Sequence, residues 1–343
     1  MNALERIRRT AALERCDRPP VIAQLFAHAA VACGRSMEEY LGSGATAAAC
    51  QLEARRHYGN EAVFAVLDLA LEAEALGGEI QRRAGTYPAV KRPPLAPDDD
   101  FARRPIPDPR AAGRLPMVLE MARAMRAACG DEALVVGLVQ GPLTLAVQLL
   151  GMEPALVLAA DDPDRFVRLL DYATAVSEAF GVAQLASGAH LALVFEPAAS
   201  PEVVPAGLFR EMIGPRVARL FASFRRAGAL ASWIHIAGRT APLLPWYRRL
   251  GADLACFDYC VDPEPLARAD GESRICVVGN LRPLDFVTGD AAGIARDAAA
   301  LLRLFEDRGG FILSSGCEIP PEAREPNVAA LVRTGLAWNG AAR

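Results

Sequence analysis

Short runs of apolar and β-branched residues recur along the chain and alternate with amphipathic stretches. The runs lie at residues 19–25, 62–69, 133–139, 190–196, 229–236, 253–259, 274–280 and 311–315. The stretches at 115–130, 162–185 and 208–228 place apolar side chains three and four positions apart, which predicts helices. We expect Asp162 to cap the second helix and Pro215 to kink the third. Eight buried strands that alternate with helices are typical of a parallel barrel.

The sequence therefore predicts an α/β fold, a single (β/α)8 TIM barrel over residues 1–343 with an N-terminal extension. A doubly wound open sheet is the alternative. That fold usually carries a glycine-rich phosphate loop after an early strand, and the sequence has no G-x-G-x-x-G or Walker motif. The Pro-rich, charged segment at 79–109 breaks the rhythm of strands and helices. We expect it to form an excursion or hairpin near the barrel mouth.

Composition narrows the class of function. The chain has 343 residues, of which 52% are hydrophobic and 23% charged, and its net charge is −4 with a pI of about 5.7. Because no basic field would attract a nucleic acid, none is expected as a partner. Lys91 is the only lysine, and it stands in a Pro-flanked segment, a poor place for a Schiff-base residue.

The start of the sequence has no apolar signal core, and no apolar stretch reaches the length of a membrane span. We therefore predict a cytoplasmic protein with no membrane partner. The eight cysteines are scattered along the chain. In a cytoplasmic protein most of them should be reduced and buried, and one or two could be ligands.

Catalytic groups of a TIM barrel project from the carboxyl ends of its strands. The polar residues at those positions are Gln24, His28, Asp68, Gln140, Glu196, His235, Asp258, Cys260, Asn280 and Cys317. Loops often begin with polar residues, so any one of these is more simply a turn residue or a solvated one. A lone histidine such as His235 is more often satisfied in the core, and a free cysteine such as Cys317 is more often inert. As a pair on one barrel mouth, the two favour a metal site.

Six segments, spread over nearly the whole chain, resemble the uroporphyrinogen decarboxylase-like superfamily. They are RPPVIAQLFAH, VQGPLTLAVQLLG, FEPAASPEVVPAGLFREMIGP, WIHIAG, VVGNLRPLDFVTG and FILSSGCEIPPEAREPNVAAL. Within it the chain is similar to the corrinoid-dependent methyltransferase branch, of the methylcobamide:coenzyme M methyltransferase type. The resemblance implies a TIM barrel, in agreement with the strand pattern. Uroporphyrinogen decarboxylases proper carry an early arginine-rich motif for substrate carboxylates, and the matching segment here, PVIAQLFAHAA, has no arginine.

The methyltransferase branch typically holds zinc with a His-x-Cys pair and a distant cysteine. His235 and Cys317 match two of these ligands, whereas Ala237 replaces the middle cysteine. A third ligand could come from Glu196 or from Cys260, each at the end of a neighbouring strand. With such a ligand set, zinc would activate a substrate thiol for methyl transfer.

The resemblance also implies a metal-free alternative, in which the methyl acceptor is a pterin nitrogen, as in tetrahydrofolate, and no zinc thiolate is needed. A carboxylate would then handle the acceptor's proton. The expected catalytic contacts are Asp258, Asn280 and Gln140. The expected cofactor contacts are Gln24, His28 and Asp68, with the first two on the rim that would receive the corrinoid.

We therefore expect a methyltransferase that moves a methyl group between a corrinoid (methylcobamide), carried by a partner protein, and a small acceptor such as a thiol or tetrahydrofolate. The corrinoid is assigned to a partner because this chain has no D-x-H-x-x-G motif. A uroporphyrinogen decarboxylase-like lyase is the first alternative, and it would need arginines that point into the pocket, with Arg239 the one to inspect. A binding barrel that has lost its zinc site is the second, and Ala237 is its best argument.

Overall fold

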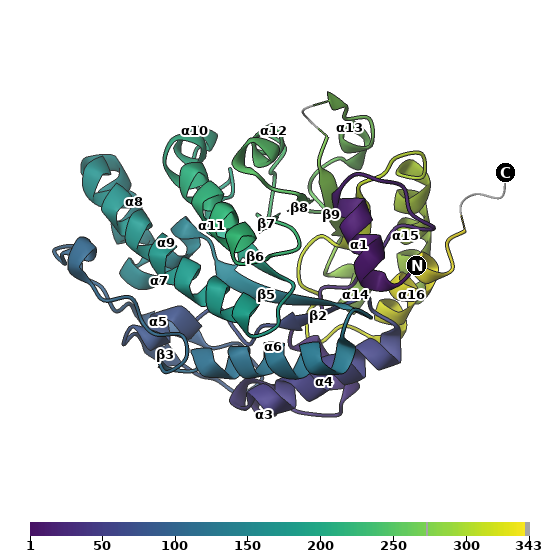
Figure 1. Cartoon of the computed structure of the whole chain (residues 1–343), viewed down its shortest axis with the longest axis horizontal. Helices are drawn as coiled ribbons and strands as arrows, with labels where there is room; N and C mark the ends of the chain where they lie inside the picture. The colour runs from purple at the N-terminus through teal and green to yellow at the C-terminus, as the bar shows by residue number, and fades with distance from the viewer. Residues whose placement is uncertain (272–273, 340–343) are drawn as a thin grey trace.

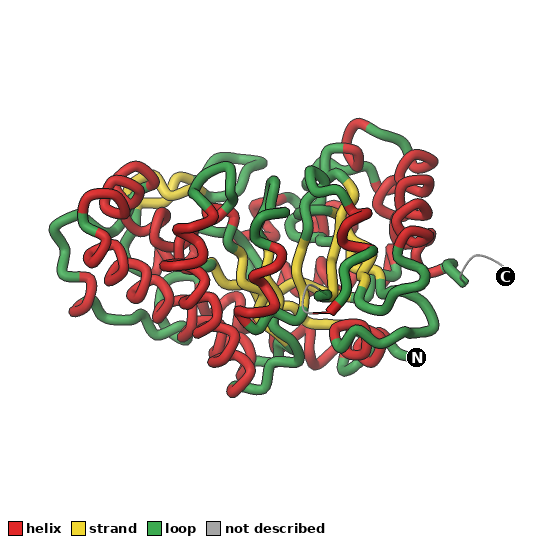
Figure 2. The backbone as a smooth tube through the Cα atoms, turned by 90° about the horizontal axis from the view of Figure 1, so that it is seen from above, coloured by secondary structure: helices red, strands yellow, loops and turns green. Residues whose placement is uncertain are grey.

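An eight-stranded parallel sheet curves into a nearly closed barrel, and helices surround it (Figure 1, Figure 2). The computed structural model describes residues 1–271 and 274–339. The barrel strands are β1 (Val21–Ile22), β2 (Ala62–Ala65), β5 (Leu134–Gln140), β6 (Leu191–Phe195), β7 (Trp233–His235), β8 (Leu254–Cys256), β9 (Cys276–Leu281) and β10 (Phe311–Ser315). Each lies within or beside one of the eight apolar runs, so the predicted TIM-barrel fold is confirmed.

The strand order is β1-β10-β9-β8-β7-β6-β5-β2, with every neighbouring pair parallel. Side chains join the two end strands, β1 and β2. Asn60 accepts a hydrogen bond from the Ala23 N–H at 2.8 Å and donates one to the Ala23 carbonyl at 3.0 Å. The Glu61 carboxylate accepts the Val21 N–H at 2.7 Å. These bonds satisfy edge groups that would otherwise be open to pairing with another strand.

The strands are buried on both faces, which is why their sequences read as continuous apolar runs. Within β5, Val136 and Leu138 pack into the barrel interior with Trp233, whereas Val135 and Val139 pack outward against the helices. This alternation follows from the two-residue period of a strand. The packed interior fills the barrel below its mouth. This packing fixes the positions of the strand ends, and with them the backbone that carries the polar side chains at the mouth.

The three helices predicted from apolar spacing are present. Residues 115–130 correspond to α6 (Leu115–Cys129) and residues 162–185 to α9 (Pro163–Ala186), which the Asp162 carboxylate caps by accepting the Arg165 N–H at 3.0 Å. The third stretch is composite. It consists of α10 (Ala206–Leu208), a π-helical turn η3 (Phe209–Ile213) and α11 (Gly214–Arg226). Pro215, which has no N–H to donate, lies in the first turn of α11, directly after that irregular turn.

The remaining described helices complete the outer layer and the loops. They are α1 (Ala3–Ala11), α2 (His28–Ala32), α3 (Met37–Gly42), α4 (Gly44–Tyr58), α5 (Leu71–Ala75), α7 (Pro142–Leu150), α8 (Met152–Asp161), α12 (Leu244–Tyr247), α13 (Pro263–Ala267), α14 (Asp285–Thr288), α15 (Ala291–Leu304) and α16 (Glu325–Leu336), with 3₁₀ turns η1 (Phe101–Arg103), η2 (Pro197–Ala199) and η4 (Arg248–Leu250). The predicted N-terminal extension is α1. The Arg6 guanidinium anchors it to the buried Glu61 carboxylate.

The excursion at 79–109 contains an antiparallel hairpin of β3 (Glu79–Gln81) and β4 (Ala89–Arg92), followed by η1. Between the two strands, the Tyr87 hydroxyl accepts the Ala27 N–H at 3.0 Å, which places the hairpin over the loop that follows β1. The excursion therefore lies at the barrel mouth, as predicted. Among the described residues, no single helix is long and apolar enough to cross a membrane. The bent pair α7 and α8, at 111°, meets that length and composition only when the two are taken together.

Candidate active site

His235 and Cys317 meet at the mouth of the barrel. His235 is the last residue of β7, and Cys317 follows β10 by two residues. The Cys317 Sγ lies 3.4 Å from the His235 Nε2. These strands are separated by β8 and β9 in the sheet, so the two side chains approach each other across the mouth. The structure thus brings together the pair that the sequence singled out.

Burial keeps both members of the pair uncharged near neutral pH. Burial lowers the pKa of His235 to about 4, against an opposing effect of the Asp258 charge. It raises the pKa of Cys317 to about 12, against a lowering by the backbone N–H of Glu318. The His235 ring stacks on Phe195, with ring centroids 4.6 Å apart. Its Nδ1 has no hydrogen-bond partner among the described residues. The site therefore presents a thiol against a neutral imidazole.

Glu196, expected as the replacement zinc ligand, binds the start of α7 instead. Its carboxylate accepts the Leu143 N–H at 3.2 Å, the Thr144 N–H at 2.8 Å and the Thr144 hydroxyl at 3.1 Å. Gly141 makes room for it, because a Cβ there would lie 1.7 Å from a Glu196 oxygen. The Gly-Pro turn after β5 thus leaves space for the buried Glu196 side chain, which caps the start of α7. These contacts give no support to Glu196 as a ligand.

The residues present do not form a complete zinc site. Structural zinc takes four protein ligands and catalytic zinc usually three. No group of three or more His, Cys, Asp or Glu side chains among residues 1–271 and 274–339 is placed to hold a metal ion. The other expected ligand, Cys260, lies in the loop after β8, where its N–H donates to Asp258 at 3.1 Å. With two donors at most, we derive no chemical step through zinc.

Purified protein is therefore expected to contain less than about 0.1 zinc per chain after equilibration with zinc and removal of the excess, because two ligands hold the ion too weakly. Elemental analysis of the wild type beside His235→Ala and Cys317→Ala checks this. One zinc per chain that is lost in both variants would contradict the expectation and would require a third ligand that this arrangement does not supply.

Asp258, which acts on His235 electrostatically, and Asn280, which bonds to Asp258, are occupied in holding loops. The Asp258 carboxylate accepts the N–H groups of Gly238 at 2.9 Å and Cys260 at 3.1 Å. The Asn280 side-chain amide donates to the carbonyls of Asp258 and Val261, both at 3.1 Å. These bonds tie the loops after β7 and β8 to each other and to β9. They support a positioning function more directly than the expected catalytic one.

Gln140 and Asp68 belong to a second polar group on the β2–β5 side. The Gln140 amide donates to the Glu72 carboxylate at 2.9 Å, and burial raises the pKa of Glu72 to about 7. Asp68 accepts two hydrogen bonds from Arg114, the shorter at 2.7 Å. Gln140 pairs in register with Phe195, which in turn pairs with His235. The group is therefore linked to the central pair through the sheet.

The two residues expected on the corrinoid-receiving rim are both buried. The His28 ring nitrogens lie 3.1 Å from the Pro321 carbonyl and 3.1 Å from the Tyr58 hydroxyl, so both positions are occupied. The Gln24 amide donates to the Ser315 carbonyl at 2.9 Å, and its Oε1 has no partner among the described residues. His28 is thus a packed histidine, and the structure does not place it where a cofactor could reach its ring.

A cavity of about 380 Å³ opens next to residues that adjoin the His235–Cys317 pair, although neither His235 nor Cys317 itself lines it. It is lined by Phe195, which stacks on His235, and by Glu318, which follows Cys317. The Tyr87 hydroxyl from the hairpin donates to Glu318. Burial raises the pKa of Glu318 to about 7, against the lowering by Tyr87. Tyr87 was not among the expected site residues, because nothing in its local sequence connects it to a strand end.

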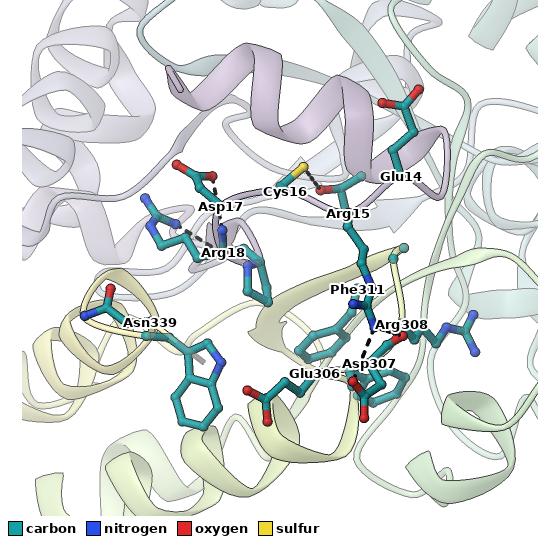
Figure 3. A pocket seen from close by; sticks show the side chains of 16 residues that line it. Glu14, Arg15, Cys16, Asp17, Arg18, Glu306, Asp307, Arg308, Phe311 and Asn339 are labelled. Carbon is teal, nitrogen blue, oxygen red and sulfur yellow. Dashed lines mark hydrogen bonds and ion pairs between the residues drawn. The ribbon is translucent and has the colours of Figure 1, made fainter. Parts of the chain in front are cut away.

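A second cavity, of about 530 Å³, lies at the opposite end of the barrel, beside Phe311, the first residue of β10. Its charged groups are engaged with one another and with the barrel. Arg15 reaches across to Asp307 (Figure 3). Arg18 binds Glu61 at 2.8 Å. At this end of a TIM barrel, side chains usually serve stability. The mouth cavity is therefore the candidate active site.

Comparison with known proteins agrees with this architecture. The sequence model for uroporphyrinogen decarboxylase (URO-D) matches residues 2–337. The chain belongs to the uroporphyrinogen decarboxylase family. This confirms the family predicted from the six segments.

Two kinds of relative within the uroporphyrinogen decarboxylase family are similar to the chain. A methylcobamide:CoM methyltransferase of Methanosarcina barkeri is 28% identical over 278 residues, covering 80% of this chain and 79% of the relative. A uroporphyrinogen decarboxylase of Sinorhizobium fredii is 29% identical over 292 residues, covering 82% and 80%. A solved methyltransferase structure from Methanosarcina mazei superposes with a TM-score of 0.88 at 24% identity, over 97% and 98% of the two chains. That last likeness supports the fold.

Proposed function

We propose that this chain transfers a methyl group between a corrinoid carried by a partner protein and a small acceptor, such as a thiol or tetrahydrofolate. The corrinoid supplies or receives the methyl group at its cobalt when the partner docks. This chain binds the acceptor in the mouth cavity, beside His235 and Cys317, and its apolar wall keeps water from the reacting atom. The methyltransferase relatives support the reaction class.

The observation that carries the proposal is the lining of this cavity. A uroporphyrinogen decarboxylase-like lyase would have to bind several substrate carboxylates, for which arginine is the usual partner. None of the described residues that line the cavity is Arg, Lys or His. Arg239, the candidate for that function, is exposed and lies 3.8 Å from Glu202. The lining favours methyl transfer to a compact acceptor over decarboxylation of a polycarboxylate.

Incubation of the purified protein with methylcobalamin tests the proposal. With 2-mercaptoethanol or tetrahydrofolate as acceptor, we expect enzyme-dependent loss of methylcobalamin absorbance and one methylated product by mass spectrometry. Release of CO₂ from uroporphyrinogen without methyl transfer would instead establish the lyase. No turnover in either assay would favour the binding barrel.

A further inference from the structure

The mouth cavity is unsuited to a negatively charged ligand. Much of its wall is apolar and includes Phe26, Val66 and Val90. Its polar side chains include Asp68 and Glu318 but, among the described residues that line it, no basic group. An anion that is buried against such a wall loses its hydration and gains no positive partner in exchange.

Arg114, which is bonded to the lining, is already neutralised. Its Nη1 lies 2.7 Å from an Asp68 oxygen, and its Nε lies 2.7 Å from a Glu74 oxygen. Two carboxylates therefore share one guanidinium. A ligand anion would have to displace one of them and leave it without its partner.

The start of α7 is also unavailable to an anion. The N-terminus of a helix normally attracts anions through its free N–H groups and its dipole. Here the N–H groups of Leu143 and Thr144 both donate to the buried Glu196. The protein's own carboxylate thus occupies the anion-binding end of this helix.

The carboxyl group of Glu318 forms a polar corner at the edge of the mouth cavity. This corner favours hydrogen-bond donors and cations. The Tyr87 hydroxyl accepts the Ala27 N–H at 3.0 Å and directs its own hydrogen at Glu318. The phenol therefore fixes the carboxyl group at the edge of the cavity. Oxygen atoms in this corner favour a ligand that donates hydrogen bonds or carries a positive charge, and they repel an acid group.

We propose that this cavity binds a small methyl acceptor that is uncharged or positively charged, and that it discriminates against acceptors bearing a sulfonate or carboxylate group. Of the two acceptors named above, the selectivity therefore favours a thiol over tetrahydrofolate, whose glutamate carries two carboxylates. The proposal rests on the function proposed above, because it takes the mouth cavity as the acceptor site. It differs from that function in being a statement about binding, which can be tested without turnover.

Three S-methylated compounds of equal chain length separate the charges. They are 2-(methylthio)ethylamine, 2-(methylthio)ethanol and 2-(methylthio)ethanesulfonate, the last being methylated coenzyme M. Calorimetric titration of the full chain is expected to show the sulfonate binding at least about tenfold more weakly than the alcohol, and the amine at least as tightly as the alcohol. Sulfonate binding as tight as that of the alcohol, or no binding of any of the three, would overturn the proposal.

Variants locate the effect in the cavity. Glu318→Gln should reduce the preference for the amine over the alcohol, whereas Glu322→Gln, an exposed position in the same loop, should leave all three affinities unchanged. Gln148→Arg adds a guanidinium to the lining and should strengthen sulfonate binding at least about tenfold. If Gln148→Arg folds and gains nothing, the sulfonate is excluded for another reason and the proposal falls.

The methylcobalamin assay keeps the two proposals apart. Charge-selective binding without methyl transfer to any acceptor would leave the cavity's selectivity intact and would reject the methyltransferase function. Methyl transfer together with tightest binding of the sulfonate would support the methyltransferase function and would reject the proposed charge selectivity of the cavity.

Discussion

Replacing Cys317 with alanine is expected to lower the rate of methyl transfer at least about 100-fold, a loss typical of removing a group that acts in the reaction. The Cys317 Sγ lies 3.4 Å from the His235 Nε2, and its neighbour Glu318 lines the cavity. The change leaves the buried imidazole of His235 without that contact, next to the cavity that is proposed to bind the acceptor. Initial rates with methylcobalamin, at saturating acceptor, measure the effect.

Cys276→Ala is the matched control, because it makes the same chemical change, the loss of a cysteine thiol, at a position away from the cavity. Cys276 is fully buried within β9, in the packed interior of the barrel. Its loss leaves a small cavity and should cost about 1–2 kcal/mol of unfolding free energy. The rate of methyl transfer should stay within about threefold of the wild type, since the effect of a distant core cavity on a rate is small. Equal losses of rate in the two variants would show that Cys317 acts only through stability.

The fold could be predicted because the physical rule that governs it is local. A strand buried on both faces must be apolar along its length, and each of the eight barrel strands overlaps such a run. The His235–Cys317 pair followed from two further premises. One is that strand ends converge at the mouth of a barrel, and the other is the resemblance to a family that places ligands there.

The contacts of the polar residues could not be predicted, because a sequence does not show where a side chain points. Glu196 stands at a strand end, as a metal ligand would, yet its carboxylate turns to the start of α7. The signal was present in Gly141, which leaves the space that this carboxylate fills. Tyr87 and Glu318 are 231 positions apart, and only the path of the hairpin brings them together.

Replacing Glu196 with alanine is expected to lower the free energy of unfolding by about 2–4 kcal/mol, because buried donors that lose their acceptor and the cavity left by the side chain both cost stability. Three donors on Leu143 and Thr144 lose their acceptor, and a cavity forms beside Gly141. Unfolding in urea, followed by circular dichroism, measures the loss. Glu202→Ala, an exposed carboxylate in the following loop, is the control and should cost less than about 1 kcal/mol. A small loss in Glu196→Ala would mean that water or a rearranged loop satisfies the helix.

The same carboxyl group should give stability a specific dependence on pH. Burial raises the pKa of Glu196 to about 8, so the folded chain keeps a proton that the unfolded chain releases above its ordinary pKa of about 4.5. Stability from this group therefore falls as pH rises between those values. Burial lowers the pKa of His235 and of His190, each to about 4, which makes stability rise with pH, but that effect ends near pH 6.5. Between pH 6.5 and 8 the carboxyl effect remains.

Glu196→Gln removes the titrating proton while preserving the size of the side chain. Between pH 6.5 and 8 the wild type should lose about 1.5 kcal/mol of stability more than this variant does, since each pKa unit of difference is worth about 1.4 kcal/mol. Glu72 and Glu318, whose pKa values burial also raises to about 7, titrate in both proteins and cancel in the difference. Parallel pH profiles would show that the hydrogen bonds from α7 outweigh burial, so that Glu196 stays ionised as a helix cap throughout this range.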